Sequence, residues 1–435
     1  MPQRQDAPDL PEVSLERVAR FRLKRQCLLE SARGDLAELV SRTGWLLATS
    51  GETPYLALFA RAAEFHREDL DRAVFEEHTL LELPGARATT HIVPAAEGML
   101  CLFGYARDVE TRLQKLRQSA RLTDAEMEKI ESAVRSALTQ GPLPLEEIRK
   151  KLGAEDNRDL GMPGQSTGYR NVFAAALAHL LAKGTVLKMN ADGRLDRGRT
   201  VVVTAKRIVS DQRLRPVGPA ETARKLAQLY FRAAGPASVE DFAWWAGLSP
   251  EESRAAVTSL GGELAGVRVS DERAASRLPA PDAEELLASD DGATATVALL
   301  LPHGDNLFAL RRASAQVVRP AHARYPILDW RGEAIPAGVA GAGHHAPVVL
   351  DGFVAGAWEF DPEKRVVRWE TFEPQPEETV ALLDERAETL GAFIRDEIDP
   401  EAGRGDDALS RPGRVREMAK LWRALRRPPG KRRIG

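Results

Sequence analysis

The sequence predicts an α+β fold in which small helical units, each completed by a β-hairpin, are followed by a small β-barrel. Three observations support this prediction. Serines and glycines that begin and end short helices recur along the first two thirds of the chain, alternating strands follow those helices, and short strands dominate from Thr294 onward. With 435 residues, 43% of them hydrophobic, the chain is too long for one ordinary domain.

The stretch GPASVEDFAWWAGLSPEESRAAV at residues 235–257 illustrates the predicted helical units. Ser238 and Ser249 each stand three positions before an acidic residue, so each serine is expected to cap a helix. Gly247 lies between them and can adopt the left-handed conformation that ends a helix. A helical pattern at 223–234 precedes this stretch, and LAGVRVSDE after it alternates like an edge strand. Three helices followed by a hairpin are the order of a winged helix.

The preceding block repeats this order. Helical patterns cover 124–138, 141–153 and 171–183, and the glycine-rich run GMPGQSTGYR is expected to form a loop before the third helix. Two alternating strands, TVLKMN and RTVVVTA, follow, and the Asp-Gly pair between them is a strong hairpin signal. This hairpin is predicted to be a basic wing, with Lys188, Arg194, Arg197, Arg199, Lys206 and Arg207 in its loop and flanks.

The N-terminal block predicts an elaborated version of the same unit. Helical patterns are expected at 14–31, 35–43, 54–64, 67–81 and 97–118, and the run ATTHIVP at 88–94 is typical of a strand. Helix-turn-helix units in series favour nucleic-acid binding over the alternative, in which such units serve only packing or dimerisation.

Short, closely spaced strands after Thr294 indicate a small closed or half-closed barrel. They are TATVALLLP, NLFAL, AQVVRP, YPILDW, APVVLDG, FVAGAWEF and RVVRWETF. The run PAPDAEELLASDDGA before them is typical of an exposed boundary. The segment 377–407 is strongly acidic and 411–433 is strongly basic. Within the basic tail, helical spacing predicts an apolar seam that docks on the protein, formed by Val415, Met418, Trp422 and Leu425.

These patterns divide the chain into five predicted domains. They are an N-terminal elaborated winged helix at 1–122, a second winged helix at 123–215, a third at 216–278, a β-barrel at 279–376 and a helical C-terminal segment with the basic tail at 377–435.

Composition excludes several classes of protein. No apolar run approaches the length of a membrane span, and the first residues lack the apolar core of a signal peptide. The only cysteines, Cys27 and Cys101, form no paired motif, which excludes a cysteine-rich zinc site and fits a reducing compartment. The net charge of −3 hides an uneven distribution of charge. We expect a cytoplasmic monomer that needs no metal or other cofactor.

Two histidine patterns suggest metal chemistry and are rejected. His66 and Glu68 have the H-x-E form of zinc deaminases, but no P-C-x-x-C follows them. His344 and His345 are adjacent at the start of a predicted strand, where neighbouring side chains point to opposite faces and rarely share one metal.

Four segments together resemble the bacterial winged-helix DNA glycosylases of the AlkZ and YcaQ type. They are PYLALFARAAEF at 54–65, the run from Arg87 to His91 that is close to the family's Arg-Gly-Thr-x-His, the stretch at 235–257, and LLLPHGDNLFALRR at 299–312 together with VVLDGFVAGAW at 348–358. Because these segments span nearly the whole chain in order, the resemblance implies tandem winged helices and a β-barrel arranged around duplex DNA.

The resemblance also places the family's catalytic glutamine, aliphatic residue, and glutamine or aspartate just before PYLALFAR. In this chain that position reads LLATSGETP, residues 46–54, without either glutamine. A glycosylase needs a polar group that holds and polarises water beside the sugar. The candidates are Thr49, Ser50 and Glu52, and by family analogy Thr89 and His91. Gln26 belongs to the first helix and is interpreted as structural.

Three hypotheses remain open at this point. The first is a DNA-binding protein linked to the recognition or repair of alkylated DNA, which acts as a monofunctional glycosylase if excision survives. The second is a non-catalytic DNA-binding or regulatory protein, and the third is a scaffold that binds other proteins. For the first two we expect double-stranded DNA as the partner, contacted by Arg87, Tyr169, Arg170, Lys188, Arg194, Arg197, Arg199, Arg254, Arg311 and Arg312.

Overall fold

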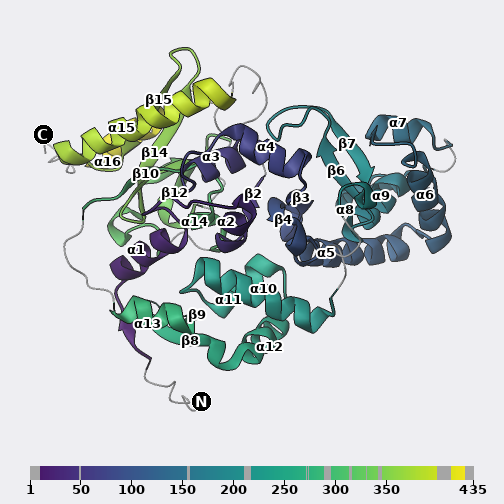
Figure 1. Cartoon of the computed structure of the whole chain (residues 1–435), viewed down its shortest axis with the longest axis horizontal. Helices are drawn as coiled ribbons and strands as arrows, with labels where there is room; N and C mark the ends of the chain where they lie inside the picture. Colours follow the sequence, from purple (N-terminus) through teal and green to yellow (C-terminus); the bar gives the residue numbers. More distant parts are fainter. Residues whose placement is uncertain are drawn as a thin grey trace, which may run out of the picture.

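The computed structural model describes residues 10–48, 50–153, 157–209, 217–270, 272, 274–288, 295–312, 316–329, 331–340, 345–398 and 413–426. Figure 1 shows an α+β fold in which the described residues form several small sheets surrounded by helices. The α+β class expected from the sequence is confirmed. None of the helices within these ranges has the length and apolar character that crossing a bilayer requires.

The N-terminal unit combines five helices with a three-stranded sheet. Its elements are α1 (Leu15–Arg25), α2 (Leu36–Arg42), β2 (Leu46–Leu47), α3 (Thr53–Phe59), α4 (Arg67–Phe75), β3 (Leu80–Pro84), β4 (Thr90–Pro94) and α5 (Gly98–Ser119). The sheet order is β2-β4-β3. The helix expected at 67–81 ends early because Leu80 and Leu81 pair with β4 and are buried, so the end of that pattern is a strand.

The second unit follows the predicted helical order with one addition. It contains α6 (Asp124–Ala137), β5 (Leu143–Pro144), α7 (Leu145–Lys150), α8 (Gly161–Thr167), α9 (Val172–Ala182), β6 (Val186–Asn190) and β7 (Thr200–Thr204). The glycine-rich run expected to be a loop contains α8, which ends at Gly168 with a φ of 79°. Tight packing explains the glycine within α8, because a Cβ on Gly164 would lie 2.7 Å from the Tyr169 carbonyl oxygen.

The third unit confirms the predicted caps. It contains α10 (Pro219–Ala234), α11 (Val239–Ala246), α12 (Pro250–Leu260), β8 (Leu264–Val269) and β9 (Ser276–Pro279). The Ser238 and Ser249 side chains each accept a hydrogen bond from a first-turn amide, and Gly247 has a φ of 67°.

Two expectations about the flanks of this unit are wrong. β8 is a central strand rather than an edge strand, because β1 (Glu12–Val13) pairs with it in parallel on the side opposite β9. Part of the expected boundary run forms α13 (Ala280–Ala288), whose residues Ala283 and Leu286 pack in the core beside β8.

The C-terminal part is a curled half-barrel rather than a closed barrel. β10 (Ala298–Leu300), β13 (Ala346–Leu350), β14 (Phe353–Asp361) and β15 (Val366–Thr371) form one sheet, while β11 (Pro326–Leu328) and β12 (Ala334–Pro336) form a separate hairpin. The expected strand NLFAL is instead the short helix α14 (Asn306–Ala309), because the Asp305 carboxylate caps the Leu307 amide.

Two C-terminal helices cover the half-barrel, as Figure 1 shows. α15 (Glu377–Phe393) packs against β10 and β15, and α16 (Arg414–Arg426) packs against β11 and β15. The predicted apolar seam of α16 holds in part: Val415, Met418 and Trp422 are buried, whereas Leu425 is 43% exposed.

A fully buried ion pair joins the N-terminal unit to the half-barrel. Arg61, just after α3, donates two hydrogen bonds of 2.7 Å to the Asp305 carboxylate, and both side chains are 0% exposed. Gln26 lies in the same network, since its Oε1 accepts a 3.4 Å hydrogen bond from Arg61 and its amide donates to the carbonyl oxygens of Thr43 and Ala233. The structural interpretation of Gln26 is therefore confirmed.

Removing the Asp305 carboxylate is expected to destabilise the whole protein. Asp305→Ala leaves the Arg61 guanidinium buried without its counter-ion, so the free energy of unfolding should fall by about 3–5 kcal/mol in urea titrations. The control is Arg423→Ala, which breaks an ion pair with Glu370 on the surface and should cost about 1 kcal/mol or less. Equal losses in the two variants would contradict this assignment.

Candidate functional site

The two sequence segments predicted to carry catalysis lie side by side. Leu47 of β2 stands opposite His91 of β4, and the Ala48 amide donates a 2.8 Å hydrogen bond to the Thr90 carbonyl. The loop that contains Ser50 therefore leaves the sheet beside the turn that precedes β4. Thr49, predicted as a catalytic candidate, lies outside the described residues.

A histidine from the half-barrel faces this loop. The Nε2 atom of His303 lies 3.2 Å from the Ser50 Oγ and 3.4 Å from the Thr53 Oγ1, and the two hydroxyl oxygens are 2.9 Å apart. His303 belongs to the turn after β10, in the run LPHGDN. Sequence reasoning used this run only as a mark of resemblance and missed His303, because 250 residues separate it from Thr53.

Glu52 points into the protein rather than lying on an exposed turn. It is 6% exposed at the first turn of α3, and its carbonyl oxygen accepts a hydrogen bond from the Leu56 amide. Its burial is compatible with a role beside the loop, but that role stays a prediction.

Thr89 and His91 brace the turn between β3 and β4. The Thr89 hydroxyl donates to the Ala86 carbonyl at 2.7 Å, and His91 Nε2 lies 2.8 Å from the Thr89 oxygen. Burial lowers the pKa of His91 to about 4, with a smaller contribution from the Arg87 charge, so the ring is neutral near pH 7. A neutral ring whose Nε2–H donates to Thr89 satisfies both contacts. The pair therefore holds the turn in place.

Arg87 lies on the same turn and stacks on an aromatic ring. Its guanidinium carbon is 3.6 Å from the centroid of the Trp244 ring, and its backbone amide donates to Asp108. The residue has a φ of 60° and remains exposed. The stack attaches the N-terminal turn to α11 of the third unit and leaves a cation at the surface.

The hairpin of the second unit docks against the Ser50 loop. The Leu195 amide donates a 2.8 Å hydrogen bond to the Tyr55 hydroxyl, which in turn donates to Asp71 at 2.5 Å. The contact is close, because a Cβ on Gly51 would lie 2.5 Å from the Leu195 carbonyl oxygen. The tip of the predicted wing is thus part of the site rather than a free projection.

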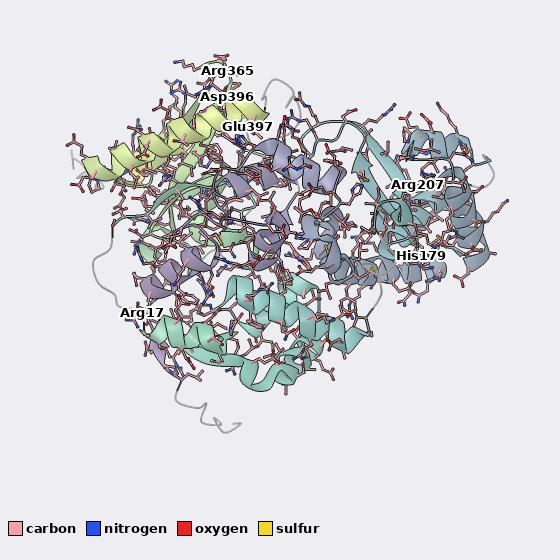
Figure 2. The ribbon with its side chains drawn as sticks, in the orientation of Figure 1. Arg17, His179, Arg207, Arg365, Asp396 and Glu397 are labelled. Atoms are coloured by element: carbon pink, nitrogen blue, oxygen red, sulfur yellow. The ribbon has the colours of Figure 1, made fainter. Side chains whose placement is uncertain are left out.

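Arg194 is consequently mostly buried, with 13% of its side chain exposed. It pairs with Asp196 at 2.5 Å and donates to the Ile398 carbonyl at 3.0 Å. Figure 2 labels Glu397, which lies in the short π-helix Ile394–Ile398 after α15 and contacts the start of α4 by bonding to His66 at 2.8 Å. The expectation that Arg194 contacts DNA is not supported, since its donors serve these internal contacts.

Known proteins share this architecture. The sequence profile of the family described as "DNA glycosylase AlkZ-like" matches residues 40–393, which is most of the chain. The chain belongs to the AlkZ-like DNA glycosylase family. Among solved structures it is similar to the Streptomyces sahachiroi DNA glycosylase AlkZ, with a TM-score of 0.69 and 20% identity over 89% of this chain and 97% of that chain. That likeness concerns the fold, and no curated protein matches the sequence.

In this AlkZ-like protein the other predicted DNA contacts divide by exposure. Tyr169 packs in the core of the second unit at 8% exposure, and Arg311, at 5%, donates to the carbonyls of Leu307 and Ala234. A duplex cannot reach either side chain, so both expectations are corrected to structural roles. The remaining predicted contacts are exposed: Arg87, Arg170, Lys188, Arg197, Arg199, Arg254 and Arg312.

Arg207, which was predicted to flank a basic wing, also makes a contact within the protein. Figure 2 labels Arg207, which donates a 2.7 Å hydrogen bond to the Thr139 carbonyl within the second unit. Among the described residues, no group of histidine, cysteine, aspartate or glutamate side chains has the arrangement of a metal site.

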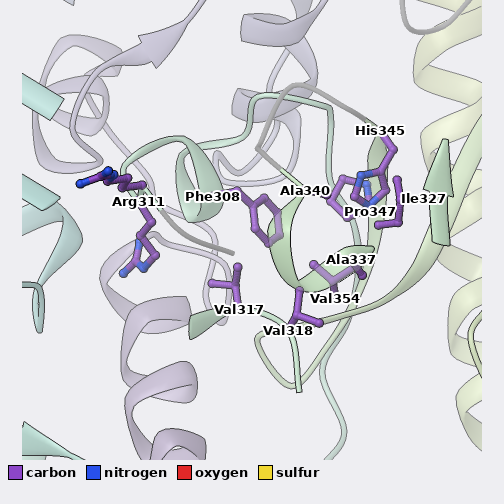
Figure 3. A pocket seen from close by; sticks show the side chains of 11 residues that line it. Phe308, Arg311, Val317, Val318, Ile327, Ala337, Ala340, His345, Pro347 and Val354 are labelled. Atoms are coloured by element: carbon purple, nitrogen blue, oxygen red, sulfur yellow. The ribbon is translucent and has the colours of Figure 1, made fainter. Parts of the chain in front are cut away.

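A separate cavity in the half-barrel is not part of this site. Figure 3 shows its mainly apolar lining, which includes Phe308, Val317, Ile327 and Val354, with Arg311 at one side. Apolar side chains dominate the lining and Ser50 is not among its residues, so the cavity is not part of the candidate site.

A methyl group on Gly51 is expected to detach the hairpin from the Ser50 loop. Gly51→Ala would force the added Cβ against the Leu195 carbonyl, so the free energy of unfolding should fall and amides of the hairpin loop should exchange faster with deuterium. The matched control is Gly262→Ala, where a Cβ would meet nothing within 4 Å. Unchanged exchange in Gly51→Ala would contradict the docking.

Glu82 of β3, which packs beside β6, is expected to make the free energy of unfolding depend on pH. Burial raises the pKa of Glu82 to about 7, against the opposing charge of Lys188. The folded state therefore binds this proton more tightly than the unfolded chain does, and the stabilisation is complete below about pH 4 and lost as the pH rises toward 7. Glu82→Gln should thus gain stability relative to wild type between pH 5 and pH 8 in urea unfolding, whereas the exposed control Glu388→Gln should show no such trend.

Proposed function

We propose that this protein binds duplex DNA and hydrolyses the glycosidic bond of alkylated bases. The observation that carries the proposal is the polar cluster of Ser50, Thr53 and His303, because Ser50 and Thr53 belong to the segment in which the resemblance would put the family's catalytic motif. The hairpin packs against this loop, and Arg197 and Arg199 near its tip are exposed. A duplex held by these cations would lie beside the polar cluster.

The chemistry of alkylated purines suits a site without the two glutamines. A purine alkylated on N7 already carries a positive charge, so it leaves as a neutral base when the bond to C1′ breaks. The protein then has to position water at C1′ and stabilise a sugar with oxocarbenium character, which hydroxyl and imidazole groups can do. The activity proposed is therefore that of a monofunctional DNA glycosylase, which needs no cofactor.

The helical units with hairpins are proposed to act as winged helices on the duplex. The second unit places four helices before its hairpin and the third unit places three, and exposed arginines stand on both, with Arg170 before α9 and Arg254 on α12. The division of the chain into domains at 1–122, 123–215, 216–278, 279–376 and 377–435 is retained as part of this proposal. Phosphate contacts would fix the register of the duplex without reading its sequence.

Non-catalytic DNA binding is the second candidate, and the absence of both catalytic glutamines favours it. An excision assay distinguishes the two candidates when duplex binding is measured beside it. A duplex with a single N7-methylguanine is incubated with the protein, and abasic sites are detected as strand breaks after alkali.

Release well above the spontaneous loss measured without protein is expected if the protein is a glycosylase. An unmethylated duplex serves as the substrate control. Duplex binding without release above background would instead establish the non-catalytic binder, and the absence of any duplex binding at low salt would leave the scaffold hypothesis.

Arg199 is expected to contribute one phosphate contact. Arg199→Ala should weaken binding to any duplex and reduce the slope of log K against log salt by about 0.9, as measured by fluorescence anisotropy between 50 and 200 mM salt. The control is Arg368→Ala, which removes a cation already paired with Asp361 on β15. Identical salt slopes for Arg199→Ala and wild type would remove the hairpin from the interface.

A further inference from the structure

We propose that His303 is a catalytic residue that takes the place of the missing glutamines, with the Ser50 hydroxyl as its partner in holding the attacking water. This inference rests on the proposed function and deepens it. It assigns a role to a residue outside the family's catalytic motif, contributed by the half-barrel rather than by the N-terminal unit.

The hydroxyls of the loop face the imidazole instead of capping the helix. Ser50 and Thr53 flank the start of α3, where serine and threonine usually bond to free amides. Among the described residues, no side chain caps α3. Both hydroxyl oxygens lie within 3.4 Å of His303 Nε2 instead. Because both hydroxyls lie near one nitrogen atom instead of bonding to the free amides of the helix, the arrangement supports a role for His303 Nε2.

The imidazole is held in position by the surrounding backbone. Gly304, the next residue, has a φ of 72°, and a Cβ there would lie 2.8 Å from the Leu47 side chain. Asp305 follows and forms the buried ion pair with Arg61. His303 is thus two residues from the fully buried ion pair that joins the two parts of the protein. Positioning of this kind is what a group that orients water requires.

Exposure in the cluster increases from Thr53 to Ser50 and His303. Thr53 is 1% exposed, whereas Ser50 and His303 are half-buried. The inner hydroxyl can support the imidazole, while the Ser50 oxygen and the imidazole edge remain within reach of the surface. A glutamine amide and a neutral imidazole each offer an acceptor for a hydrogen bond from water, so the exchange keeps the positioning of water, and the imidazole can in addition take the proton.

The step balances with one water and no further reactant. Water held by Ser50 Oγ and His303 Nε2 attacks C1′ of the nucleotide, and the bond from C1′ to the base nitrogen breaks. The electron pair of that bond leaves with the cationic base, which becomes neutral. The proton lost by water passes to His303 Nε2, either directly or through the Ser50 hydroxyl, and then to solvent.

The test compares His303→Ala, His303→Gln and Ser50→Ala with wild type. The measurements are the single-turnover release of N7-methylguanine from a duplex and, separately, the binding of an unmodified duplex. We expect His303→Ala to lower the release rate by about 10²- to 10⁴-fold with little change in binding, and His303→Gln to retain more of the rate than alanine. The control is His66→Ala, which removes an exposed histidine bonded to Glu397.

Imidazole in the buffer provides the readout that a structural role would not move. It should restore part of the rate of His303→Ala and none of the rate of Ser50→Ala. A lack of rescue would overturn proton transfer by His303. If wild type releases the base and His303→Ala releases it at the same rate, the inference is wrong while the proposed function stands. The same holds if both His303 variants lose duplex binding or folded structure to the same extent as they lose the release rate. A wild-type protein that releases no base would overturn the proposed function and this inference together.

Discussion

The buried ion pair between Arg61 and Asp305 fixes the relative position of the two segments that make the site. Arg61 directly follows the helix that begins with the Ser50 loop, and Asp305 follows His303 by two residues. Dehydrating two charges is costly, and only a single bidentate geometry offsets that cost. We infer that the pair mainly selects one arrangement of the N-terminal unit relative to the half-barrel, and that its net contribution to the free energy of folding is smaller.

A second set of contacts brings the hairpin of the second unit to the same place. Tyr55 bonds to Leu195, and Gly51 admits the hairpin backbone because it has no side chain. The Arg87 stack on Trp244 joins the third unit to the turn before β4. The hairpin and the half-barrel meet at the loop after β2, and the third unit attaches to the turn before β4, so base chemistry at this point would draw on several units rather than on one domain.

Local signals in the sequence predicted local structure well. Ser238, Ser249 and Gly247 specify their caps and turn through their own side chains and backbone, so no distant residue is needed to recognise them. The α8 helix and the strand β3 were missed because packing overrides local preference there: Gly164 is required by a close backbone contact, and Leu80 pairs with Pro94. The burial of Arg194 could not be predicted either, because one of its partners, Ile398, is 204 positions away in the sequence and only Asp196 is close. His303 carries no motif, and only the tertiary fold shows what it faces.

Membership of the AlkZ-like family together with the absence of its glutamines makes the location of the damaged nucleotide the central claim. A crystal structure of the protein bound to a duplex that contains a tetrahydrofuran abasic analogue tests it directly. The account predicts the analogue's sugar turned out of the helix, with its C1′ position facing Ser50 and His303 across one ordered water. An analogue stacked within the duplex, or a sugar held elsewhere on the protein, would contradict it.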